Sequence, residues 1–170
     1  MDQRWDKPLE SDQRPNPIIR TGRVGLEGIH EPTPEELAKI FTTGKHSLQT
    51  WGRKPGVKRG AEPHWIGVFK PGPLHTDRAY PRMTHHLVLK VDPGFFIRGH
   101  NREETPLERG TILCLDTHSP HQIQTSVKGA SWYVAVSVDS AMPIALSKVR
   151  GPLLEYARTT PVVTPDVIDR

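Results

Sequence analysis

Proline and glycine interrupt this chain so often that long helices are excluded from most of it. The 170 residues include 17 prolines and 14 glycines. Proline inside a helix removes a hydrogen bond and clashes with the preceding turn, so a helical bundle is not compatible with this density. Short strands tolerate both residues well, because the turns between strands need the backbone angles that glycine and proline supply. The chain is therefore expected to be mainly β-structure.

Short apolar runs bounded by turn residues predict strands from residue 64 onward. The segment between Arg102 and Arg109 is charged and is interpreted as a loop. Turns are expected at 92–94 and 128–129. Many short strands in one segment favour a two-sheet sandwich or jelly roll. The predicted strands are 64–70, 83–91, 95–98, 111–115, 121–126 and 131–138.

Residues 33–44 carry the clearest helix signal. Thr33 can cap the helix, Pro34 fits its first position and Gly44 can end it. Leu37 begins an apolar stripe, so we expect this N-terminal helix to pack on the outside of the strands.

The chain is expected to divide into three parts. An extended arm with at most one short strand, at 17–20 or 23–26, precedes a jelly-roll domain that includes the helix. A tail with a short helix near 153–157 follows. The predicted limits are 1–32, 33–140 and 141–170.

Composition excludes several classes of protein. No apolar run approaches the roughly 20 residues that a membrane span requires. The N-terminus lacks the apolar stretch of a secretory signal, and Cys114 is the only cysteine, so neither a disulfide framework nor a cysteine-cluster zinc site is expected. We expect a cytoplasmic protein. A net charge of +4 is weak support for a nucleic-acid partner, and a homodimer is the default oligomer.

Histidines concentrate between residues 75 and 121 and suggest a metal site. His75 and Asp77 alternate, so in extended backbone their side chains share one face. A second group, containing His118 and His121, follows the strand predicted at 111–115. Two imidazoles and one carboxylate form the ligand set typical of non-haem Fe(II) sites, which leaves positions open for dioxygen and a co-substrate.

Two segments resemble the aspartyl/asparaginyl β-hydroxylase branch of the Fe(II)/2-oxoglutarate dioxygenases. They are HLVLKVDPGFFIR at 86–98 and GTILCLDTHSPH at 110–121, and the resemblance covers residues 64–138. It implies a double-stranded β-helix, or jelly roll, of about eight strands. It also implies an iron site made by His75, Asp77 and His121, with His86 lining the 2-oxoglutarate pocket.

One position departs from the family pattern. The arginine that usually binds the far carboxylate of 2-oxoglutarate would fall near Ser131. Arg98, then Lys90, are the preferred substitutes, because Arg98 follows the Pro-Gly turn and Lys90 has the strand parity of His86. Lys128 is the third candidate.

For several other residues a structural role is the alternative to a functional one. Tyr80 and Arg82 follow the His-X-Asp pair, where they could bind substrate or form an ordinary loop. Asp116 is expected to shape a turn, and His118 could replace His121 as ligand. His85 is expected to be structural, as is Cys114 in the core.

The resemblance implies a hydroxylase that acts on an amino-acid-like or other small polar substrate, or on a peptide residue. Two alternatives stay open: a non-catalytic jelly-roll module for binding or assembly, and a cupin-like metal enzyme that does not use 2-oxoglutarate. Metal content and 2-oxoglutarate turnover would separate the three.

Overall fold

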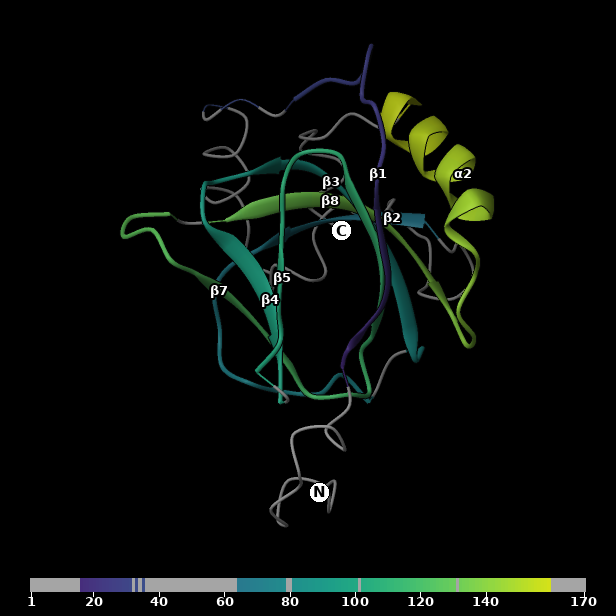
Figure 1. Ribbon diagram of the computed structural model, residues 1–170. Coiled ribbons are helices and arrows are strands. Elements are labelled where there is room, and N and C mark those ends of the chain that lie inside the picture. Colours follow the sequence, from purple (N-terminus) through teal and green to yellow (C-terminus); the bar gives the residue numbers. More distant parts are fainter. Residues whose placement is uncertain are drawn as a thin grey trace.

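The computed structural model describes residues 16–31, 33, 35, 64–78, 81–100, 102–130 and 132–159. Within these residues the chain is mostly strand, with one helix (Figure 1), which confirms the predicted all-β class for this part of the chain. The elements are β1 (Ile18–Arg23), β2 (His64–Phe69), β3 (Met83–Val91), β4 (Phe95–Gly99), β5 (Glu104–Pro106), β6 (Thr111–Asp116), β7 (His121–Thr125), β8 (Tyr133–Ser140) and α2 (Leu146–Thr159).

The strands form two antiparallel sheets. The larger has the order β1-β6-β3-β8-β2 and the smaller has the order β5-β4-β7. Pairing is nested along the chain, because β2 pairs with β8, β3 with β6 and β4 with β5. His75, between β2 and β3, forms a β-bridge with His121 at the start of β7. Two segments distant in the sequence therefore meet at one end of the sheet pair.

Strand alternation divides the apolar side chains into two layers. One cluster fills the space between the two sheets, and we call this the inner cluster. The other lies between the larger sheet and α2. The inner cluster includes Phe69, Val88, Phe95, Ile97, Leu113, Leu115, Tyr133 and Ala135, whereas the outer one includes Leu87, Leu89, Ile112, Val134, Val136, Val149 and Leu153.

Helix α2 is much longer than the short helix expected near 153–157. Pro152 lies inside it, and a proline there normally shortens or kinks a helix. Four side chains at helical spacing, Val149, Leu153, Tyr156 and Ala157, are buried in the outer cluster. Burial of this face against the larger sheet outweighs the lost hydrogen bond. Figure 1 shows α2 along the outside of that sheet.

The predicted strands from residue 64 onward are confirmed to within two residues at each end. The loop interpretation of 102–109 is wrong in part, because β5 pairs with β4 there. This three-residue edge strand has no apolar alternation that the sequence could reveal. β1 overlaps both proposed positions and pairs with β6. The helix predicted at 33–44 lies outside the described residues except for Thr33 and Glu35.

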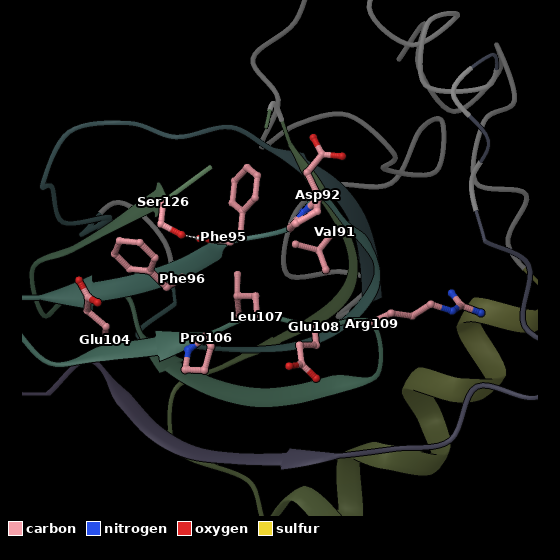
Figure 2. A pocket seen from close by; sticks show the side chains of 12 residues that line it. Val91, Asp92, Phe95, Phe96, Glu104, Pro106, Leu107, Glu108, Arg109 and Ser126 are labelled. Atoms are coloured by element: carbon pink, nitrogen blue, oxygen red, sulfur yellow. Dashed lines mark hydrogen bonds between the residues drawn. The ribbon is translucent and has the colours of Figure 1, made fainter. Parts of the chain in front are cut away.

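A cavity of about 710 Å³ lies at the opposite end of the sheet pair from the His75–His121 bridge. Figure 2 shows apolar side chains, among them Phe95 and Leu107, between the carboxylates of Asp92, Glu104 and Glu108. Each carboxylate already has a partner in the described chain, and the guanidinium of Arg109, which also lines the cavity, donates to the carbonyl oxygens of Leu89 and Ile29. The partners of the carboxylates are the backbone N–H of Trp132 and the side chains of Arg98 and Arg23.

Candidate metal centre

Three of the predicted ligands meet at the bridged end of the sheets. One ligand atom each from His75, Asp77 and His121 lies within 4.8 Å of the other two. Asp77 Oδ2 is 3.6 Å from His75 Nε2 and 3.2 Å from His121 Nε2. Two imidazole nitrogens and a carboxylate oxygen converging on one point are compatible with a bound metal ion.

Backbone carbonyl groups orient both imidazoles. The Nδ1–H of His75 donates to the carbonyl oxygen of Pro73, and the Nδ1–H of His121 donates to that of Ser119, both at 2.8 Å. A carbonyl oxygen only accepts, so Nδ1 carries a proton in both rings. In the neutral rings each Nε2 therefore has a lone pair directed at the shared point. This outer-shell support is typical of histidines that bind metals.

The charges of the group reinforce one another when no metal is bound. Burial alone would raise the pKa of Asp77, but hydrogen bonds from His121 and His75 outweigh it and hold the pKa well below its usual range. The hydrogen bond to Asp77 raises the pKa of His75, and burial opposes it only in part. The carboxylate is therefore ionised at neutral pH, as a metal ligand must be.

Main-chain hydrogen bonds place the ligand-bearing loop. The N–H of Gly72 donates to the carbonyl of Ile123, and the N–H of Asp77 donates to the carbonyl of Thr117. The side-chain amide of Gln124 also donates to Gly72 O at 3.0 Å. The loop after β2 is thus attached to β7 and to the turn before it, and this brings the His-X-Asp pair to His121.

Asp116 shapes the turn that delivers His121, as predicted. Its Oδ1 accepts from the N–H of His118 at 3.0 Å, and its Oδ2 accepts from the hydroxyl of Ser119 at 3.1 Å. Arg82 Nη2 lies 3.0 Å from Asp116 Oδ2. In the described structure Arg82 therefore supports the turn. His118 is in this turn and is not one of the three clustered ligands.

The two adjacent histidines of β3 face opposite layers. His86 Nδ1 is 3.1 Å from Ser137 Oγ, and its ring meets the edge of Phe69 in the inner cluster. Burial, followed by the nearby His85 and His121, lowers the pKa of His86 to about 3. His85 faces the other layer, where its Nδ1 lies 3.3 Å from Val138 O and its Nε2 accepts from the N–H of Ile144. His85 is thus a structural residue.

Lys90 does not share the face of His86. The register of β3 against β8 shifts between Val88 and Lys90, so the alternation is broken at this point. Val91 packs against the inner cluster, and Lys90 Nζ lies 3.7 Å from Glu31 Oε1. The parity argument for Lys90 is therefore wrong, because strand alternation does not survive a bulge.

Arg98 and Lys128 also lie away from the space beside His86. Ile97 belongs to the inner cluster, so the next residue, Arg98, faces outward, where it pairs with Glu104. Lys128 is exposed in the turn after β7, at the opposite end from His121. None of the three candidate cations faces the inner cluster in the described chain.

The positions of Tyr80 and Ser131 lie outside the described residues. Two hydroxyl groups that the sequence analysis did not select flank His86 on the inner face: Ser137, and Thr84, which is 4% exposed. The Oγ1 atom of Thr84 is buried without a hydrogen-bond partner in the described structure. Strand parity with His86 was the one signal that could have identified Thr84.

The chain matches no protein-family model and no curated protein. Among the described residues no helix has both the length and the apolar character needed to cross a membrane.

Proposed function

We propose that this protein is a mononuclear non-haem Fe(II) oxygenase of the double-stranded β-helix type. His75, Asp77 and His121 would hold the iron. 2-Oxoglutarate is the co-substrate that the family resemblance implies, and a small polar compound or peptide residue would be hydroxylated. The observation that carries the proposal is the convergence of the two Nε2 atoms and the carboxylate on one point. A hydrogen bond from Nδ1 to a backbone carbonyl orients each imidazole.

The strand pairing supports the jelly-roll part of this proposal. β2 pairs with β8, the segment at His75 bridges to β7, β3 pairs with β6, and β4 pairs with β5. From β2 onward the outermost elements pair with each other and each inner element pairs with its counterpart, as in a long hairpin that folds into two facing sheets, whereas β1 is added beside β6. This nested order supports the proposal of a jelly roll of eight strands.

The residues fit an iron ion in type and in protonation. His75, Asp77 and His121 would hold the iron with three ligand atoms, and the ion would supply open positions for dioxygen and a co-substrate. Asp77 is ionised and adds negative charge, which favours a divalent cation. The carbonyls of Pro73 and Ser119 prevent the imidazoles from rotating away from it. His86, held neutral by burial, offers a polar but uncharged wall beside the centre.

A second candidate function uses the same metal without 2-oxoglutarate. It is favoured by the placement of the three candidate cations, since Lys90, Arg98 and Lys128 all lie elsewhere. A planar cation that pairs with the far carboxylate is difficult to replace. This candidate is a cupin-like metal enzyme, a simple dioxygenase or an isomerase.

Anaerobic titration tests the proposal. Fe(II) is added to the metal-free protein, then 2-oxoglutarate, and the visible metal-to-ligand charge-transfer band is recorded for the wild type and for His75→Ala. His118→Ala is the matched control, because His118 is a nearby imidazole outside the ligand group. The expected band requires both additions, is absent in His75→Ala and persists in His118→Ala.

Other outcomes separate the alternatives. Iron binding that depends on His75 but gives no band with 2-oxoglutarate would support the cupin-like enzyme. Absence of stoichiometric Fe(II) binding in the wild type would refute the metal centre and leave a binding or assembly module.

A further inference from the structure

A second cavity lies at the same end of the sheets as the metal centre. It has a volume of about 460 Å³ and is lined by Leu74, Arg98, Gly99, His100, Arg102 and Gln122. Leu74 precedes the ligand His75, Gln122 follows the ligand His121, and Gly99 pairs directly with His121. The cavity therefore adjoins the backbone that carries two of the three ligands.

Strand alternation places this cavity on the outer face of the smaller sheet. Ile97 and Ile123 pack with the inner cluster, whereas the paired residues Arg98 and Gln122 face the other way. His100 and Arg102, in the turn after β4, line the cavity, and Gly99 before them pairs with the ligand His121. We call this turn the rim, because a ligand that reached both the cavity and the metal centre would pass it.

Arg102 occupies the rim in a strained conformation. Its φ is 65°, in the left-handed region that glycine or asparagine normally occupies in hairpin turns. Its N–H closes the turn by donating to the carbonyl of Gly99 at 3.0 Å. Its exposed guanidinium makes no hydrogen bond or ion pair with the part of the chain that the structure describes. Arginine is thus present where glycine would relieve strain, and strain of this kind concentrates at functional sites.

Arg98 supplies a second guanidinium that is already held in place. Its Nε and Nη2 donate to Glu104, and its Cζ lies 5.2 Å from the ring centre of Phe96. Among the described residues the Nη1 group of Arg98 has no partner, so it can donate to a ligand. Glu104 balances the charge of Arg98, so Arg102 leaves the cavity with net positive charge.

We propose that this cavity binds the anionic group, a carboxylate or a phosphate, of the substrate that reacts at the metal centre. Guanidinium groups bind such oxyanions through parallel charge-assisted hydrogen bonds. Arg102 provides a guanidinium that has no partner among the described residues, and Arg98 and Gln122 provide further donors. The link to catalysis rests on the proposed function, but anion binding at the cavity does not.

The test measures anion binding by the metal-free protein, so that neither probe can bind through iron. Inorganic phosphate and malonate are titrated separately by calorimetry into the wild type, Arg102→Gly and Arg150→Gln. Arg150 lies exposed on α2, and its substitution removes the same charge at a distance. Thermal unfolding of each variant without anion is recorded in parallel.

We expect the wild type to bind the anion saturably. Arg102→Gly should weaken the affinity at least about tenfold, because it removes one charge-assisted pair of hydrogen bonds. Arg150→Gln should leave the affinity unchanged, and Arg102→Gly should unfold at the same or a higher temperature because its backbone strain is relieved. Tighter phosphate binding would indicate a phosphorylated substrate and tighter malonate binding an acidic one. Equal weakening in both variants, or no saturable binding of either probe by the wild type, would overturn the inference. Neither result would affect the Fe(II) titration.

Discussion

The buried neutral His86 should make the metal-free protein lose stability as the pH falls from 7 to 5. Burial, with smaller contributions from His85 and His121, lowers the pKa of His86 to about 3 in the folded state. In the unfolded chain the imidazole has its ordinary pKa of about 6.5. Below that pH the unfolded state binds a proton that the folded state does not, so the free energy of unfolding decreases.

The magnitude follows from the difference in pKa. Each pH unit between about 6.5 and 3 costs about 1.4 kcal/mol, so the loss by pH 5 is about 2 kcal/mol from this one residue. Two other histidines titrate nearby. Burial lowers the pKa of His85, which adds to the loss, whereas the hydrogen bond to Asp77 raises the pKa of His75, which opposes it. A variant comparison is therefore needed to isolate His86.

Urea unfolding of the metal-free protein at pH 7 and pH 5 is the assay, with wild type, His86→Gln and His30→Gln. His30 is exposed, so its substitution removes an imidazole from the surface rather than from the core. The decrease from pH 7 to pH 5 should be about 2 kcal/mol smaller in His86→Gln than in the wild type, and unchanged in His30→Gln. An equal decrease in wild type and His86→Gln would show that the burial argument is incorrect.

Three further substitutions test the packing around the site. Thr84→Val removes a buried hydroxyl that lacks a partner in the described structure, so urea unfolding should show equal or up to about 1 kcal/mol greater stability; a clear loss would reveal an undetected hydrogen bond. Asp116→Ala removes the acceptor of three donors, namely Arg82 and two groups in the turn before His121. It should cost about 2 kcal/mol and weaken Fe(II) binding in the anaerobic titration; unaltered Fe(II) affinity would show that the turn does not position the ligand. Leu153→Ala creates a cavity between α2 and the larger sheet and should cost about 3 kcal/mol in the same urea assay; a loss below about 1 kcal/mol would mean that α2 contributes little to the core.

Local patterns were sufficient for most of the strands and for the pair of His75 and Asp77. Alternating apolar runs and Pro-Gly turns are properties of neighbouring residues, so β3, β4, β6 and β7 could be located from them. The His-X-Asp spacing likewise places His75 and Asp77 together whenever the backbone is extended. His121 could be named from the resemblance, but its approach to that pair depends on a bridge between distant segments.

The remaining features arise from contacts that no local pattern encodes. The extent of α2 depends on burial of Leu153 against the larger sheet, which outweighs the break expected at Pro152. Lys90 does not face the inner cluster because the register of β3 against β8 shifts. Arg98 faces outward beside the buried Ile97, and there it pairs with Glu104 on β5. Strand register and ion pairs join residues far apart in the chain, so they follow from how the sheets assemble. The local sequence thus predicts which residue types can bind a metal, whereas the positions of charged side chains such as Lys90 and Arg98 depend on the folded structure.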